Sequence, residues 1–251
     1  MNAAGRDASL EPVFVLHTRA YSNSSLIVEV LAREHGRIAL VARGVRAQRS
    51  RTAGLLQPFQ PLAMSWRLRG EMGTLQQVEA AGRPLRLQGR RLVSGLYSNE
   101  LLIRLLGRED PHPGLFEGYV QLIESLAAEA PEAPALRTFE RDLLGLLGYG
   151  LALATDTQGD PLVPAQWYRY DPHQGAIPVA GPQAGGVVVQ GQALLDLARN
   201  PISMATARAT RALMRSALNP HLGGRPLKSR ELYARYSPQG ESSNGASSGQ
   251  S

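Results

Sequence analysis

The stretch that decides the fold is Leu62-Ala-Met-Ser-Trp-Arg-Leu-Arg69, where large apolar side chains alternate with smaller or charged ones over eight residues. Side chains of a β-strand point to opposite faces in turn, so this alternation predicts a strand with one apolar face. The same alternation puts Arg67 and Arg69 on one face, opposite Trp66. The stretch therefore predicts a sheet with an apolar inner side and a basic outer side.

Four more short strands are expected around this one within residues 1–82. Each is a run of aliphatic or β-branched residues that ends at a turn or a polar loop, as at His35-Gly36. The expected ranges are 13–16, 25–31, 37–41 and 74–79, with a loop over 43–54 and a short helix near 53–57. Five short strands with a helix before the fourth predict a barrel of the OB type, although other small barrels share this pattern.

From residue 90 the spacing of apolar residues changes to three and four, which is typical of helices. Helices are expected over 92–106, 115–127, 136–147, 191–199 and 203–218. Residues 155–186 are rich in Gly, Pro and Asp, which indicates an irregular insert with short strands near 167–170 and 187–189. The predicted class is α+β, with an OB-fold domain over 1–82, a helical domain over 83–236 and a disordered low-complexity tail over 237–251.

The composition of the 251 residues excludes several classes of protein. It is 43% hydrophobic and 19% charged, a globular mixture. There is no Cys, which excludes disulfides, thiolate zinc sites, iron–sulfur clusters and cysteine nucleophiles. No apolar run approaches the roughly 20 residues of a membrane span, and no signal peptide is recognisable, so we expect a cytoplasmic, nucleoid-associated protein.

The net charge of +6 hides a strong segregation along the chain. Residues 1–98 carry 14 Arg and 6 acids, residues 99–160 carry 4 Arg and 11 acids, and residues 199–251 carry 8 basic residues and 2 acids. Of the 27 basic residues, 26 are Arg and one is Lys228. A basic head, an acidic middle and a basic end indicate that different surfaces meet different partners.

The basic head contains the strongest candidate for a binding site. No acid occurs between Glu34 and Glu71, and guanidinium groups bind phosphates bidentately. Nucleic acid is therefore the leading partner for this face, against the alternative of a solvated charge run from a GC-rich genome. The predicted DNA-binding residues are Arg37, Arg43, Arg46, Arg49, Arg51, Arg67 and Arg69. Tyr21, Phe59 and Trp66 are the nearest aromatic residues for base stacking, although Phe59 and Trp66 also fit a core.

A second basic surface is expected near the end of the chain. Arg208, Arg211 and Arg215 have spacings of three and four, which place them on one face of a helix. Arg225, Lys228 and Arg230 follow in the next segment. This surface would extend the nucleic-acid footprint, receive an acidic peptide or be merely solvated.

No pattern of residues indicates catalysis. The only Lys does not follow a phosphate-binding glycine loop, and the five His have no metal-ligand spacing. A GxSxG match at 245–249 lies in the Ser/Gly tail, without the strand and helix that a nucleophile elbow needs. We therefore predict a binding protein without cofactor or metal, and not an enzyme.

Ordered motifs along the chain resemble those of the bacterial recombination mediator family RecO. The set covers roughly residues 12–236 and is specific because its members occur in collinear order. The motifs are Val15-Leu-His-Thr-Arg19, Ser24-Ser-Leu-Ile-Val28, Val41-Ala-Arg-Gly44, Leu56-Gln-Pro-Phe-Gln-Pro-Leu62, Leu96-Tyr-Ser-Asn-Glu-Leu-Leu102, Leu146-Leu-Gly-Tyr-Gly150 and His221-Leu-Gly-Gly-Arg-Pro-Leu-Lys-Ser-Arg-Glu-Leu232.

The resemblance implies a non-catalytic protein of DNA repair and recombination. Members of the family bind single- and double-stranded DNA and anneal complementary strands. With RecR they load RecA onto strands covered by the single-strand-binding protein SSB, in the RecF pathway. Many members carry a four-cysteine zinc module in the insert, so this chain resembles the zinc-free, gammaproteobacterial-like branch. We expect a monomer when the protein is alone.

The family also engages the acidic, hydrophobic C-terminal tail of SSB through the helical domain. Such a tail needs an apolar pocket with a basic rim. Tyr97, Leu101, Phe139 and Leu143 are expected to form the apolar wall, although such positions by default belong to a core, and Arg137 and Arg141 the rim.

Two other classes of function compete with the mediator. One is a protein-interaction adaptor whose basic barrel binds acidic partners. The other is a metal-dependent nuclease or strand-transfer enzyme, which the lack of paired acids in the basic barrel disfavours.

Overall fold

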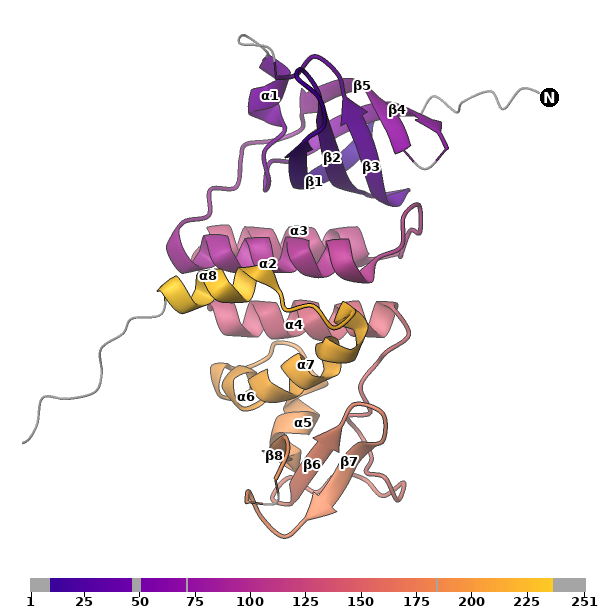
Figure 1. Ribbon diagram of the computed structural model, residues 1–251. Coiled ribbons are helices and arrows are strands. Elements are labelled where there is room, and N and C mark those ends of the chain that lie inside the picture. Colours follow the sequence, from indigo (N-terminus) through magenta and orange to yellow (C-terminus); the bar gives the residue numbers. More distant parts are fainter. Residues whose placement is uncertain (1–9, 47–50, 71, 184, 237–251) are drawn as a thin grey trace, which may run out of the picture.

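The computed structural model describes residues 10–46, 51–70, 72–183 and 185–236. The predicted tail over 237–251, its GxSxG match and Arg49 lie outside the described residues. The chain forms three tiers: a β-barrel, a layer of long helices, and a small sheet with short helices (Figure 1). The expected α+β class is confirmed.

Five strands close into the barrel in the order β1-β2-β3-β5-β4, an OB-like arrangement in which β1 also pairs with β4. The short helix α1 lies between β3 and β4, as in the predicted pattern. Large apolar side chains of alternate positions, such as those of Val28, Leu40, Met64 and Trp66, fill the interior. The elements are β1 (Glu11–Ala20), β2 (Leu26–Ala32), β3 (Gly36–Ala42), α1 (Arg51–Leu55), β4 (Leu62–Arg69) and β5 (Met72–Ala80).

The long helices follow the predicted apolar stripes, and shorter ones complete the helical part. The expected continuous helix over 203–218 is wrong, because the chain bends at Thr210 between α6 and α7. The Thr210 hydroxyl donates to the Thr206 carbonyl at 2.8 Å, a side-chain bond of the kind that bends helices. The helices are α2 (Gly89–Leu105), α3 (Leu115–Ala127), α4 (Glu132–Leu146), α5 (Gly191–Leu197), α6 (Met204–Ala209), α7 (Arg211–Leu218), the 3₁₀ helix η1 (Asn219–Leu222) and α8 (Lys228–Tyr236).

The insert is more regular than its composition indicates. Strands β6 (Trp167–Asp171), β7 (Gly175–Val179) and β8 (Val188–Gln190) form an antiparallel sheet in the order β7-β6-β8. The Tyr168 side chain, which belongs to β6, is buried, and its hydroxyl accepts a hydrogen bond from the Val163 N–H at 2.9 Å. Packing and such hydrogen bonds hold this sheet in a chain that has no Cys.

The barrel docks on α2 and α3 through apolar side chains on its outer face. The Phe14 ring lies 5.7 Å from that of Phe116 and 5.3 Å from that of Tyr119, measured between centroids. The Asn99 amide donates to the Leu16 carbonyl at 3.0 Å and accepts from the Tyr119 hydroxyl at 2.7 Å. One continuous core therefore joins barrel and helices.

A buried carboxylate strengthens this junction. Glu29 pairs with Arg37 at 3.0 Å and with Arg108 at 3.1 Å. The Arg37 guanidinium also donates to the carbonyls of Ile103 at 2.6 Å and Leu106 at 2.8 Å, at the end of α2. The carbonyl groups at a helix C-terminus favour a positive charge, so Arg37 fixes the barrel to this helix end.

Helix α8 is fixed to α2 at its start. The Glu100 carboxylate accepts the N–H groups of Lys228 and Ser229 at 2.9 Å, and Arg104 donates to the Arg225 and Pro226 carbonyls. Burial alone would raise the pKa of Glu100, but hydrogen bonds from Ser229 and Lys228 hold this pKa below its usual value. An anion at the N-terminus of a helix is favourable, so the contact stabilises α8.

Candidate nucleic-acid interface

A row of directly paired residues crosses all five strands on the outer face of the barrel. Strand register pairs Arg19 with Ile27, Ile27 with Val41, Val41 with Thr74, and Thr74 with Arg67. Directly paired residues point to the same side of a sheet, so Arg19 and Arg67 belong to one outer belt. Arg19 is exposed and was missed in the sequence, because it stands outside the acid-free stretch.

The β1–β2 turn and the segment after β3 meet at one end of this belt. The Arg46 guanidinium donates to the Ser22 carbonyl at 2.5 Å, and the Arg46 N–H donates to the Ser24 carbonyl at 3.0 Å. Tyr21 in the turn is 59% exposed, and Arg43 is exposed as well. A cationic loop and an open aromatic ring thus lie together, which is the chemistry of single-strand binding.

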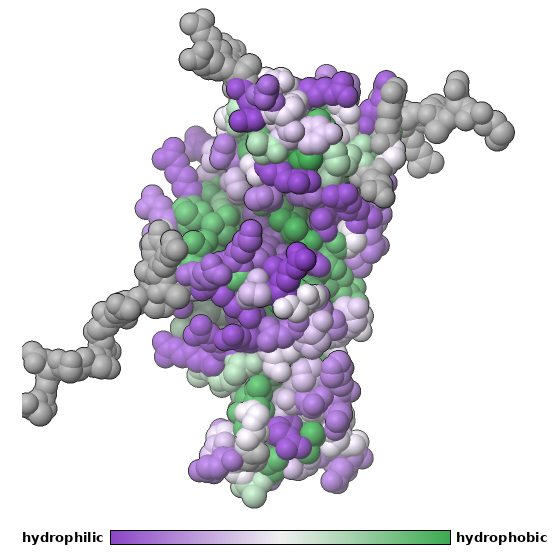
Figure 2. Space-filling view, viewed as in Figure 1, coloured by the Kyte–Doolittle hydropathy of each residue, from purple (hydrophilic) through white to green (hydrophobic). Residues whose placement is uncertain are grey.

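The predicted DNA-binding residues differ in exposure and in their place on the barrel. Arg43 and Arg46 are exposed, whereas Arg67 is half-buried on the belt. Arg51 begins α1 and Arg69 ends β4, which places both positions on the barrel. Hydrophilic side chains cover much of the barrel surface in view (Figure 2).

Arg37 differs from the other predicted DNA-binding residues. Its side chain is only 14% exposed, and its guanidinium binds Glu29 and two helix carbonyls. These partners occupy its donors at the junction with α2. Arg37 is therefore a residue of the interdomain junction, and we leave it out of the DNA surface.

The aromatic candidates also separate by burial. Trp66 is 1% exposed inside the barrel, edge-on to the His35 ring, and Phe59 is 4% exposed. Both are core residues, as their apolar positions allow. Tyr21 remains for stacking on a base.

The second basic surface is not one helical face. Arg208 lies in α6, whereas Arg211 and Arg215 lie in α7 beyond the bend at Thr210. Arg225 and Lys228 are exposed, and the Arg230 guanidinium donates to the Asn219 amide oxygen at 3.2 Å. The expectation of a single stripe is wrong because the helix that it assumes is broken.

Three arginines instead lie around the buried Glu140, and a fourth lies near one of them. Arg137 pairs with Glu140 at 2.8 Å, and Arg211 and Arg230 lie near enough to act on its charge. Burial raises the pKa of Glu140, and these cations oppose that rise. Burial and the neighbouring Arg215 lower the pKa of Arg230. One carboxylate thus lies among three guanidinium groups, and Arg215 lies near the third of them, Arg230. We call the four arginines the arginine cluster: Arg137, Arg211, Arg215 and Arg230.

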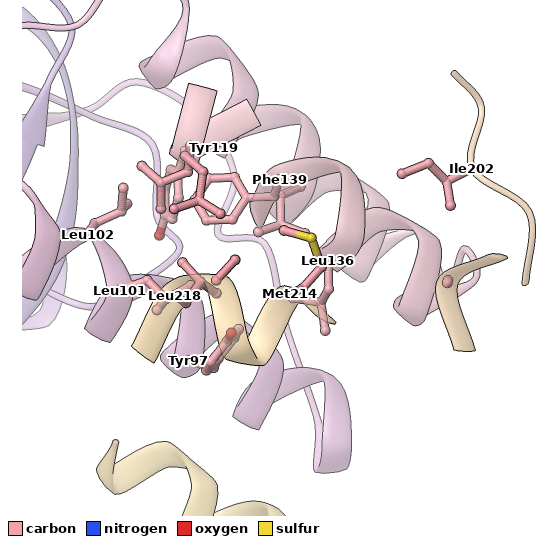
Figure 3. Packing of buried hydrophobic residues seen from close by; sticks show 14 of the residues in the cluster. Tyr97, Leu101, Leu102, Tyr119, Leu136, Phe139, Ile202, Met214 and Leu218 are labelled. Atoms are coloured by element: carbon pink, nitrogen blue, oxygen red, sulfur yellow. The ribbon is translucent and has the colours of Figure 1, made fainter. Parts of the chain in front are cut away.

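The expected apolar wall of the tail site is core. Tyr97, Leu101, Phe139 and Leu143 are 0–8% exposed, and Figure 3 shows the first three within the helix packing. The Tyr97 hydroxyl donates to Glu140 at 2.7 Å. These side chains are therefore not an open pocket wall, although Phe139 and Leu143 reach a shallow groove of about 300 Å³ between α3 and α4.

The Arg141 side chain has other partners than the arginine cluster. Its guanidinium donates to the Leu197 carbonyl at 2.8 Å, the Arg199 carbonyl at 3.2 Å and the Asn200 side chain at 3.1 Å. It borders a hollow of about 640 Å³ with Leu146, Leu151 and Leu153. Arg137 and Arg141 therefore face different surroundings and do not form one rim.

Within the described ranges, no group of three His, Asp or Glu side chains is placed to hold a metal ion. No helix among these residues is long and apolar enough to cross a membrane.

Known proteins resemble this chain over most of its length. The family model "Recombination protein O N terminal" matches residues 9–83, and "Recombination protein O C terminal" matches residues 86–231. DNA repair protein RecO of Aromatoleum aromaticum is 46% identical over 88% of this chain and 93% of its own length. That of Ralstonia nicotianae is 44% identical over 89% and 83%, and that of Pseudomonas aeruginosa 46% over 90% and 95%. The chain belongs to the RecO family of DNA repair and recombination proteins.

Proposed function

We propose that this chain is a recombination mediator that binds DNA on its barrel and catalyses no bond cleavage. It would act in the cytoplasm, bind single and double strands, anneal complementary strands, and work with RecR and SSB to load RecA. The observation that carries the proposal is the exposed site formed by Arg43, Arg46 and Tyr21 beside the belt of the barrel. Family membership supports the role in recombination.

The barrel would bind DNA chiefly through its phosphates. Guanidinium groups on the loop after β3 and on the belt track the backbone, while Tyr21 stacks on one base. Phosphate contacts release counterions and read no sequence. The binding is therefore expected to be salt-sensitive and tolerant of sequence.

Annealing follows from the same charges. Two complementary strands repel each other through their phosphates, and a basic surface that covers one strand lowers this repulsion. Few aromatic residues, 6% of the chain, leave most bases unstacked and open to pairing. A surface that binds phosphates and leaves bases accessible favours strand pairing.

The arginine cluster is the better place for the acidic SSB tail. Arg211 and Arg215 are exposed, and their guanidinium groups form no hydrogen bond or ion pair with other described residues. The cluster has an excess of positive charge over Glu140. An acidic peptide there would complete ion pairs that the fold leaves open.

The test of DNA binding is the salt dependence of affinity in Arg43→Ala with Arg46→Ala. Each phosphate contact to a single strand contributes about 0.7 to the slope of log affinity against log salt, so we expect the slope to fall by about 1.4. Fluorescence anisotropy of a labelled oligonucleotide at several salt concentrations measures it.

The matched control is Arg169→Ala with Arg199→Ala, which removes two exposed guanidinium groups from the insert and the end of α5. This variant should keep the slope of the unmodified protein. An unchanged slope in Arg43→Ala with Arg46→Ala would show that DNA binds elsewhere on the protein. Binding of acidic proteins without measurable DNA affinity would indicate an adaptor.

A further inference from the structure

We propose that the connection between barrel and α2 is a second stretch of the single-strand track. Arg83 and Arg86, together with Arg90 at the start of α2, would bind the phosphate backbone of a strand that leaves the barrel. The inference rests on the proposed binding of DNA by the barrel. It adds the direction in which a bound single strand would leave the barrel.

The connection is strongly basic. No acid occurs between Glu79 and Glu100, and the four arginines there are Arg83, Arg86, Arg90 and Arg91. The loop after β3 lies in an acid-free run of the same kind. Nucleic acid is the first partner to consider for such a run.

The fold uses only part of this charge. Arg91 donates to three carbonyls at the end of α3, at 2.8–3.2 Å, so its charge has a structural role. Arg90 is 57% exposed and pairs with Glu132 at 3.5 Å. Arg83 and Arg86 are exposed, and neither forms a hydrogen bond or ion pair within the described part of the chain.

The connection is held in place against the barrel. The Ala81 N–H donates to the Pro61 carbonyl and the Leu85 N–H to the Phe59 carbonyl, both at 2.9 Å. The Leu87 side chain is 8% exposed, so it faces inward. Arg86 lies between these two inward residues and faces outward. The guanidinium groups therefore project from an ordered backbone.

The start of α2 breaks a rule of helix stability. Its first turn contains no acid, its N-cap Gln88 makes no side-chain cap, and Arg90 and Arg91 occupy the first turn. Cations at the positive end of a helix are unfavourable. Arg91 is offset by its carbonyl partners, but the turn as a whole attracts anions. Departures of this kind from local rules are expected where function requires them.

The connection adjoins the barrel site along the chain. Its backbone forms hydrogen bonds with residues 59–61, which follow α1, and α1 follows the loop after β3. Figure 1 shows it descending beside α1 to the start of α2. A strand bound at the loop would thus find further cations on the same side of the molecule.

A nucleic-acid backbone fits this strip better than an acidic peptide. A peptide anchored by apolar residues needs a pocket, and the two hollows described above lie at α3, α4 and the start of the insert. Spaced cations without a pocket suit a chain of phosphates.

The test compares two lengths of single strand in Arg83→Ala with Arg86→Ala. One oligonucleotide has about 8 nucleotides, within the span of one OB fold, and the other about 25, which reaches beyond it. Since only the longer strand reaches the connection, its salt slope should fall by about 1.4. The slope for the shorter strand should not change.

Two control variants are needed. One distinguishes a loss of charge from a loss of packing, and the other distinguishes the DNA track at the connection from the DNA site on the barrel. Arg83→Lys with Arg86→Lys keeps the charge and should keep most of the slope, and thermal unfolding should be alike in both variants. Arg43→Ala with Arg46→Ala should lower the slope for both lengths; if it lowers neither, the barrel proposal fails. Equal slopes for the long strand in the alanine variant and the unmodified protein overturn the track alone. Equal losses at both lengths also overturn it, as does weaker binding of a poly-glutamate peptide with unchanged DNA binding.

Discussion

Two glycines at the ends of β3 show how similar residues have different tasks. Gly36 and Gly44 have φ angles of +68° and +69°, in the left-handed region that favours glycine. A Cβ on Gly36 would lie 2.5 Å from the Asp110 carbonyl oxygen, whereas a Cβ on Gly44 would meet nothing within 4 Å. Gly36 therefore lets the barrel approach the segment after α2, and Gly44 only forms a turn.

Gly36→Ala should destabilise the fold far more than Gly44→Ala. Both changes place a Cβ in the left-handed region, which costs about 1–2 kcal/mol. The clash with Asp110 should bring the cost at Gly36 to about 3 kcal/mol or more. Urea unfolding of the two variants measures the difference, with Gly44→Ala as the control. Equal losses of stability would contradict a close approach at Asp110.

At the same scale, the sequence predicted which residue types matter but not which partners they find. Arg37 and Arg43 belong to one acid-free run, yet Arg37 is mostly covered and paired with Glu29, whereas Arg43 is exposed. The acid that pairs with Arg37 comes from the preceding strand, across the β2–β3 pair. Only the register of that pair and the approach of α2 decide its role.

At the scale of elements, alternation and helical spacing predicted all five barrel strands and the three long helices. The short break at Thr210 was not predicted, because the apolar spacing continues across it. Helix α8 was also missed, since its first turn is fixed by Glu100 from a distant part of the chain. Contacts between elements thus set what local patterns leave open.

The break at Thr210 leads to a prediction about α7. Because it separates Arg211 and Arg215 from α6, these two side chains should act with Arg230 on an acidic tail. Reversing them in Arg211→Glu with Arg215→Glu should weaken binding of an acidic peptide that ends in Phe by about tenfold, at roughly 0.2–1 kcal/mol for each exposed pair lost or reversed. Fluorescence anisotropy of the labelled peptide measures it.

Its control is Arg169→Glu with Arg199→Glu, which should bind the peptide as the unmodified protein does. Binding of a short single strand by the α7 variant should be nearly unchanged. Undiminished affinity for the peptide would remove the arginine cluster as its site.

At the scale of the whole molecule, the barrel and helices are expected to unfold together. The two tryptophans allow the test, because Trp66 lies in the barrel and Trp167 in the insert. In Trp167→Phe, the fluorescence of Trp66 reports the barrel alone, while far-UV circular dichroism reports mainly the helices. Coincident urea transitions are expected from the shared core.

Asn99→Ala provides the contrast in the same background. It removes the hydrogen bonds to the Leu16 carbonyl and the Tyr119 hydroxyl, so the two transitions should shift to lower urea and begin to separate. Separate transitions in the protein with Asn99 intact would show that barrel and helices are independent.

The junction through Glu29, Arg37 and Asn99 has a mechanical consequence. Because these contacts join the barrel to its helices, we expect the loop after β3 and the arginine cluster to keep a fixed spacing. If a strand covered by a partner protein is to reach the loop after β3 while that partner is bound at the arginine cluster, the flexibility must come from the partner. A long flexible tail on that partner would act as the tether, and its length would set the local concentration of DNA at the barrel.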